Sequence, residues 1–138
     1  LYQSGNNTTS TTSNLRYYQG KLQCASDIVA YYSDQRLKTD FLKFDNAIEK
    51  ICSLTGGTFE WNKTAQDLNP EVCIEGERHA GLIAQDVQKI LPEAVTLAPG
   101  NKPDGSTDYL TIKYEKLVPL LVEAIKELKG EIDELKKK

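Results

Sequence analysis

The C-terminal segment repeats apolar side chains with a period of 3.5 residues, and this repeat restricts the fold more than any other feature of the sequence. The apolar positions step alternately by three and four residues, and most positions between them after Glu123 are polar. Such spacing predicts a helix over residues 117–137 with one apolar stripe for packing against other helices. We call this stripe the seam, and it consists of Val118, Leu121, Ile125, Leu128, Ile132 and Leu135.

The heptads alone do not fix what the seam packs against. Isoleucine at the first and leucine at the fourth heptad position favour a two-stranded rather than a three-stranded coiled coil. For the first turns, the alternative is a helix that packs on its own domain. Three heptads hold helices together only weakly, so we expect the seam to act together with the globular part of the chain.

The composition of the chain changes just before Ser33. Residues 1–32 are rich in Ser, Thr, Asn, Gln and Gly, and their formal charge is +1. The net charge of the whole chain is −3, so residues 33–138 carry a formal charge of −4. We interpret residues 1–32 as a loop followed by strands within residues 15–32, the end of a β-rich structure. The chain contains no Met, and we expect it to be a piece of a longer protein.

The segments between Thr39 and Tyr114 alternate between helical and strand patterns. A 3-4 apolar spacing indicates helices, alternating or β-branched runs indicate strands, and Gly, Pro and Asn mark turns. The predicted elements are a helix over 39–54, a strand over 58–62, a polar loop over 63–79, a helix over 80–91 that ends at Pro92, and strands over 93–99 and 108–114 joined by a turn over 100–107. The expected fold class is α+β, a small domain of short strands and two helices followed by the long C-terminal helix.

Charge and composition argue against several classes of partner. With 17 Lys and Arg against 20 Asp and Glu, the chain offers no basic surface for nucleic acid. No apolar run is long enough to insert into a membrane. Cys24, Cys52, Cys73 and the single histidine, His79, lack the spacing of a metal site, so we expect free thiols, no metal and no cofactor.

The stretch "SDQRLKTD", residues 33–40, carries a serine and a lysine five positions apart. Taken alone, this stretch favours a surface loop over catalysis, because such pairs occur by chance in most chains. A serine is a poor nucleophile without a base, and a lysine acts as that base only when burial lowers its pKa by about 2–3 units. Continuous helix would separate the two side chains, so we expect Ser33 to precede a helical turn that leads to Lys38. Asp34 either caps this turn or positions the serine, and Arg36 either pairs with a carboxylate or stabilises an oxyanion.

Four blocks of the sequence resemble, in order, a known family, the intramolecular chaperone auto-processing domain. It is found at the C-terminus of phage tail fibres, tailspikes and endosialidases, and in the myelin regulatory factor. The resemblance covers Ser33 to about Leu128, and the polar segment 63–79 and the dimer-like seam depart from it. The blocks are "SDQRLKTD", "DNAIEKICSLTGGTFEW", "GLIAQDVQKILPEAV" and "YLTIKYEKLVPLLVEAIKEL".

The resemblance implies a folding chaperone that cuts itself off. Residues 33–138 would form a homotrimer through a coiled coil over 117–137 and assist the folding of the upstream fibre trunk, whose end would be residues 1–32. Ser33 would be the nucleophile and Lys38 the base of a Ser-Lys dyad that cleaves once, between Tyr32 and Ser33. The protein would be made in the cytoplasm of an infected host, and the trunk would enter the virion tail, which recognises the host.

Two other functions remain open at this point. A trimerisation or receptor-binding tip of a fibre would carry the same seam and never cleave. A Ser-Lys peptidase acting on other proteins would carry the same dyad, although the sequence offers no segment for binding a substrate. The choice between attack within one chain and attack on a neighbouring chain is also open.

Overall fold

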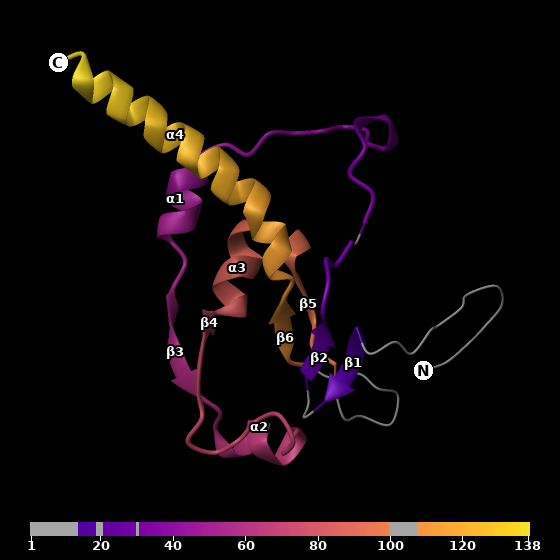
Figure 1. Cartoon of the computed structure of the whole chain (residues 1–138). Helices are drawn as coiled ribbons and strands as arrows, with labels where there is room; N and C mark the ends of the chain where they lie inside the picture. The colour runs from indigo at the N-terminus through magenta and orange to yellow at the C-terminus, as the bar shows by residue number, and fades with distance from the viewer. Residues whose placement is uncertain (1–13, 19–20, 30, 100–107) are drawn as a thin grey trace. The chain divides into compact units, whose positions relative to one another are not determined.

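The computed structural model describes residues 14–18, 21–29, 31–99 and 108–138. By their contacts the residues fall into two units, Leu1–Thr39 and Asp40–Lys138. Each unit is described by itself, and Figure 1 labels the strands and α-helices of both.

The first unit contains a hairpin and one helical turn. Strands β1 (Leu15–Tyr18) and β2 (Lys21–Cys24) pair antiparallel, and η1 (Gln35–Leu37) is a 3-10 turn. The prediction of strands over 15–32 is correct for this hairpin and wrong for the described residues after Cys24, which form none. Ile28 and Val29 are 78% and 94% exposed, so their apolar side chains gain nothing there from packing, which strand formation needs.

The second unit opens with a helix much shorter than predicted. Helix α1 spans Ala47–Cys52, so the prediction of a helix over 39–54 is wrong at its start. The backbone of Asp40 and Asn46 is left-handed, with φ of 49° and 48°, a conformation that a helix excludes and that Asp and Asn tolerate best. The apolar residues before Asn46 therefore do not continue one helical face, and Leu42 is 86% exposed.

Strand β3 (Gly56–Glu60) pairs antiparallel with β4 (Arg78–Leu82), with Gly57 opposite Gly81. Two predictions are wrong in this region, the loop over 63–79 and the start of the helix over 80–91. The polar segment 63–79 is not all loop, because Asn62 caps a short helix α2 (Lys63–Leu68) by accepting the Ala65 N–H at 3.0 Å. The helix predicted over 80–91 starts only at Ala84, as α3 (Ala84–Ile90), because residues 80–82 pair with β3.

The second strand pair follows α3. Pro92 begins a 3-10 turn, η2 (Pro92–Ala94), and strands β5 (Val95–Leu97) and β6 (Leu110–Ile112) then pair antiparallel. This confirms the two predicted strands. The predicted turn over 100–107 lies outside the described residues.

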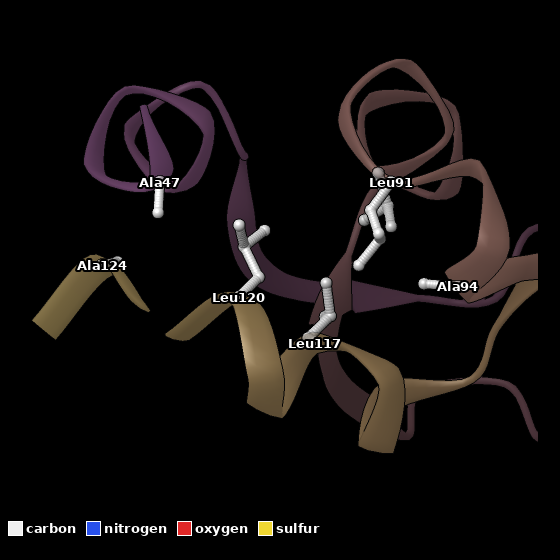
Figure 2. Close-up of a cluster of buried hydrophobic side chains, with 7 residues drawn as sticks. Ala47, Leu91, Ala94, Leu117, Leu120 and Ala124 are labelled. Atoms are coloured by element: carbon white, nitrogen blue, oxygen red, sulfur yellow. The ribbon is translucent and has the colours of Figure 1, made fainter. Parts of the chain in front are cut away.

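The chain ends in the predicted long helix. Helix α4 spans Val118–Lys136 and is preceded by a 3-10 turn, η3 (Tyr114–Leu117). One face of its first turns packs on α1 and α3 in the apolar core, as Figure 2 shows; Leu120 is fully buried there, between Leu117 and Ala124. The α+β class with a long C-terminal helix is thus confirmed. None of the described helices is both long and apolar enough to cross a membrane.

Candidate active site

The turn η1 brings Ser33 and Lys38 together. Ser33 lies before the turn and Lys38 directly after it, where the Lys38 N–H donates to the Gln35 carbonyl at 3.1 Å. The Lys38 Nζ donates to the Ser33 Oγ at 3.0 Å. The expectation that Ser33 precedes the helical turn is therefore confirmed. A single turn of 3-10 helix reverses the chain enough for the two side chains to meet, which five residues of continuous α-helix would not do.

Asp34 and Arg36 hold this turn in shape. The Asp34 Oδ1 accepts the backbone N–H of Arg36 at 2.9 Å, which caps η1. The Arg36 guanidinium also pairs with the same carboxylate, with an Nη2 to Oδ2 distance of 2.7 Å. The ion pair lowers the pKa of Asp34 and raises that of Arg36. In this chain Arg36 is thus paired with a carboxylate and Asp34 is a cap, so both shape the backbone between the serine and the lysine.

The pair lies in exposed surroundings. Ser33 and Lys38 are both exposed, and the neighbouring apolar residues Tyr32 and Leu37 are 89% and 65% exposed. Within the described part of this unit, the segment is held by local hydrogen bonds rather than by packing. The burial that a lysine base requires is therefore not supplied by the segment around Lys38.

His79 lies on β4 in a cluster of aromatic rings. Its ring centroid is 5.8 Å from that of Phe59 and 5.5 Å from that of Trp61, and the Phe59 and Trp61 rings meet edge to face at 4.9 Å. Its Nε2 is buried without a hydrogen-bond partner among the described residues. The histidine is therefore part of a packed aromatic cluster on the strand pair. In the same described ranges, no group of three or more His, Cys, Asp or Glu side chains could hold a metal ion.

Helix α4 presents two apolar faces, and only one of them is covered. Leu120 and Ala124 of α4, together with Leu117 just before it, face the core and are at most 8% exposed. The seam residues, by contrast, are 42–66% exposed. The packing of the first turns on their own domain therefore uses different residues from the seam. A continuous exposed apolar stripe of this kind indicates a surface for another protein chain.

Sequence reasoning missed Glu127, which joins α4 to α1. Its two carboxylate oxygens accept the backbone N–H groups of Ala47 and Ile48, each at 2.9 Å, and these bonds lower the pKa of Glu127. The carboxylate thereby satisfies donors that the start of a helix leaves without partners. Asn46, the residue at the cap position, makes no such side-chain bond. No local signal could have revealed this cap, because the two segments lie about eighty positions apart.

Part of the chain matches a known protein family, and the chain is similar to several known proteins. Residues 33–96 match the family described as chaperone of endosialidase. The chain is also similar to long tail fiber protein Gp37 of Enterobacteria phage M1, at 41% identity over 105 residues, which are 75% of this chain and 38% of that protein. It is 33% identical over 127 residues to Gp37 of Enterobacteria phage K3, covering 89% of this chain and 10% of that protein.

A similarity also reaches beyond phage. Myelin gene regulatory factor-like A of Dictyostelium discoideum is 30% identical over 118 residues, which are 83% of this chain and 13% of that protein. The chain thus spans about two fifths of the length of one phage relative and about an eighth or less of the other two proteins. The family match begins at Ser33 and includes both members of the hydrogen-bonded pair.

Proposed function

Because residues 33–96 belong to the family described as chaperone of endosialidase, we propose that this chain is the C-terminal intramolecular chaperone of a phage tail fibre. In this proposal the domain trimerises, assists the folding of the trunk that precedes it, and then releases itself between Tyr32 and Ser33. The phage tail fibre relatives support a protein that is made in the infected host and becomes part of the virion tail.

The observation that carries the cleavage proposal is the 3.0 Å contact between the Lys38 Nζ and the Ser33 Oγ. In the reaction, the neutral amine of Lys38 accepts the hydroxyl proton while the Ser33 Oγ attacks the carbonyl carbon of Tyr32. The peptide bond breaks, the nitrogen of Ser33 leaves with the proton returned by Lys38, and an ester joins Tyr32 to the Ser33 oxygen. Water then hydrolyses this ester and leaves Tyr32 as a free carboxylate and Ser33 as a new amino terminus.

The exposure of the pair supports a link between cleavage and assembly. A lysine in water is almost entirely protonated near pH 7 and cannot accept the serine proton. If a neighbouring copy covers Lys38, burial disfavours the charged amine and the base becomes active. In this proposal cleavage therefore waits until the chains have assembled, and the same products result from attack within a chain or between chains.

The seam supports the trimer. The chain buries one face of α4 in its own core and leaves the seam exposed, so the stripe is available to other copies. The seam residues by themselves do not favour a three-stranded coiled coil; a trimer is what the resemblance to the family implies. A tip that trimerises through the same seam and never cleaves is the second candidate, and the mass of the purified chain separates the two.

The test is a denaturing mass spectrum of freshly expressed protein. We expect two fragments, residues 1–32 and 33–138, with Ser33 at the new amino terminus. Ser33→Ala and Lys38→Arg should both leave the chain intact, because the first lacks the nucleophile and arginine stays charged near pH 7. Ser26→Ala and Lys43→Arg are matched controls outside the pair and should cleave like the parent chain. Cleavage at another bond, an unprocessed parent chain, or Lys38→Arg that cleaves at the parental rate would each contradict the proposal.

A further inference from the structure

The backbone of Tyr31 is left-handed, with a φ of 66°. Among the described residues other than glycine, only Asp40 and Asn46 share a positive φ, and both are of the types that tolerate it best. Tyrosine is not, because the left-handed region crowds its Cβ against the following carbonyl oxygen and it has no short polar side chain to compensate. The residue type therefore does not explain the conformation of Tyr31.

Packing within the first unit does not explain this conformation either. Tyr31 is 74% exposed and Tyr32 is 89% exposed. A buried ring could hold its own backbone in a costly conformation through its contacts, but both of these residues lie largely in solvent. Costly backbone conformations of this kind cluster at sites where the conformation itself is used.

Tyr31 lies directly before the bond that is cut in the proposed function. It precedes Tyr32, whose carbonyl carbon is attacked, and the chain bends at Tyr31. On the other side of the bond, the turn η1 and its cap fix the backbone between Ser33 and Lys38. The nucleophile and the base are thus held from the downstream side, and the upstream side carries the left-handed bend.

The bend affects the path of the chain that enters the scissile bond. The carbonyl of Tyr32 has to stay accessible for two steps, the attack by the Ser33 Oγ and the later attack of water on the ester. An upstream chain that lay over this carbonyl would block both steps. With Tyr31 left-handed, Tyr32 is 89% exposed, so the described residues of the first unit leave it uncovered.

We propose that Tyr31 is a positioning residue for the cleavage, because its left-handed backbone turns the upstream chain away from the Tyr32 carbonyl. The backbone conformation acts here, and the aromatic side chain does not. This inference rests on the proposed function and adds a residue to it. The rate of cleavage then depends on how readily the residue at position 31 adopts a positive φ.

Substitutions of Tyr31 that differ in backbone preference test this inference. Glycine and asparagine adopt a positive φ readily, whereas valine, which is branched at Cβ, resists it. In time courses of cell-free synthesis, Tyr31→Gly should cleave roughly 5- to 30-fold faster than Tyr31→Val, the ratio that the usual cost of a left-handed backbone gives. Tyr31→Asn should cleave at least as fast as the parent chain, and Tyr31→Phe should match it. If Tyr31→Phe matches the parent chain while Tyr31→Gly and Tyr31→Asn are as slow as Tyr31→Val, the side chain acts and the inference is overturned.

A pair of mirror-image residues removes the remaining difference in side chain. A synthetic peptide of residues 1–51 can be ligated in denaturant to an expressed segment that begins at Cys52, and refolding then starts the reaction. D-alanine in place of Tyr31 prefers a positive φ and L-alanine a negative one, so the D-alanine chain should cleave at least about fivefold faster. Far-ultraviolet circular dichroism and sedimentation should be the same for both chains. A rate difference that comes with a loss of helix signal or of assembly would overturn the inference, because position 31 would then act through the fold.

The parent chain separates the two levels of the proposal. A parent chain that is not cut between Tyr32 and Ser33 overturns the proposed function, and this inference with it. A parent chain that is cut there, with equal rates for the D-alanine and L-alanine chains, overturns this inference alone.

Discussion

Substitution of two neighbouring leucines on α4 can test the folding of the chain and its assembly separately. Leu120 is fully buried in the core of its own chain, while Leu121, one position later, is 42% exposed in the seam. Replacement of each by alanine removes the same atoms from the same helix. We therefore expect Leu120→Ala to weaken the fold of each chain and Leu121→Ala to weaken the contact between chains.

The expected magnitudes follow from burial. Truncation of a fully buried leucine costs about 2–5 kcal/mol of folding free energy. Full burial of a leucine side chain is worth about 1.5–3 kcal/mol, so covering the 42% of Leu121 that is exposed is worth roughly 0.6–1.3 kcal/mol per chain. Over three chains this is roughly 2–4 kcal/mol, which lowers the trimer association constant roughly 30- to 1,000-fold.

Sedimentation equilibrium and far-ultraviolet circular dichroism, measured over a dilution series, distinguish the two effects. Leu121→Ala should dissociate at higher concentration than the parent chain while its monomers keep their helix signal. Leu120→Ala should lose helix signal at a lower denaturant concentration. If Leu121→Ala unfolds the chain as strongly as Leu120→Ala and leaves the association constant unchanged, the seam is not the assembly surface.

Two further predictions concern contacts within the second unit. The N–H groups of Ala47 and Ile48 lower the pKa of Glu127. The ionised carboxylate therefore stabilises the fold above the ordinary glutamate pKa, and this stabilisation is lost as the pH falls through the lowered value. In urea denaturation at pH 7 and pH 3, the unfolding free energy of Glu127→Gln should change less with pH than that of the parent chain, and equal changes would refute the cap. A Cβ at Gly81 would lie 2.8 Å from the Tyr114 hydroxyl, whereas one at Gly57, directly opposite, meets nothing within 4 Å. Gly81→Ala should therefore cost about 1–3 kcal/mol of unfolding free energy, and Gly57→Ala should not destabilise; equal unfolding midpoints would contradict the packing described.

The parts of the fold that could be predicted from sequence are those whose side-chain pattern is set by one continuous element. The seam repeats over the whole of α4, and β5 and β6 are short runs between clear breaks, so both predictions are correct. The helix predicted over 39–54 failed because its apolar spacing hides two left-handed residues, Asp40 and Asn46, whose conformation no periodicity reveals. The register of β3 with β4, which turns residues 80–82 into a strand, is likewise a property of the pairing and not of either segment alone.

In the candidate site, too, the features set by local sequence were predicted and those set by distant segments were not. Ser33 and Lys38 lie five positions apart, so local geometry was enough to predict that a turn would bring them together. Glu127 acts on a helix start far away in sequence and was not predicted. Whether the pair is exposed or buried was left open, because burial depends on what packs over a segment. The sequence near Lys38 contains apolar residues, but an apolar neighbour such as Leu37 excludes water only when it is itself covered.

The exposure of the pair bears directly on when the proposed cleavage happens. A lysine side chain in water has a pKa near 10.4, so about one in 2,500 is neutral at pH 7 and able to act as a base. A chain that cleaves only after burial of Lys38 would stay joined to its trunk while it folds and be released once the neighbouring copies are in place. If the copies in the proposed assembly also supply the surface that covers Lys38, the seam and the base report on the same event. On this argument a variant that weakens the seam, such as Leu121→Ala, should also slow the appearance of the new terminus at Ser33. Cleavage at an unchanged rate in such a dissociated chain would separate the chemistry from the assembly.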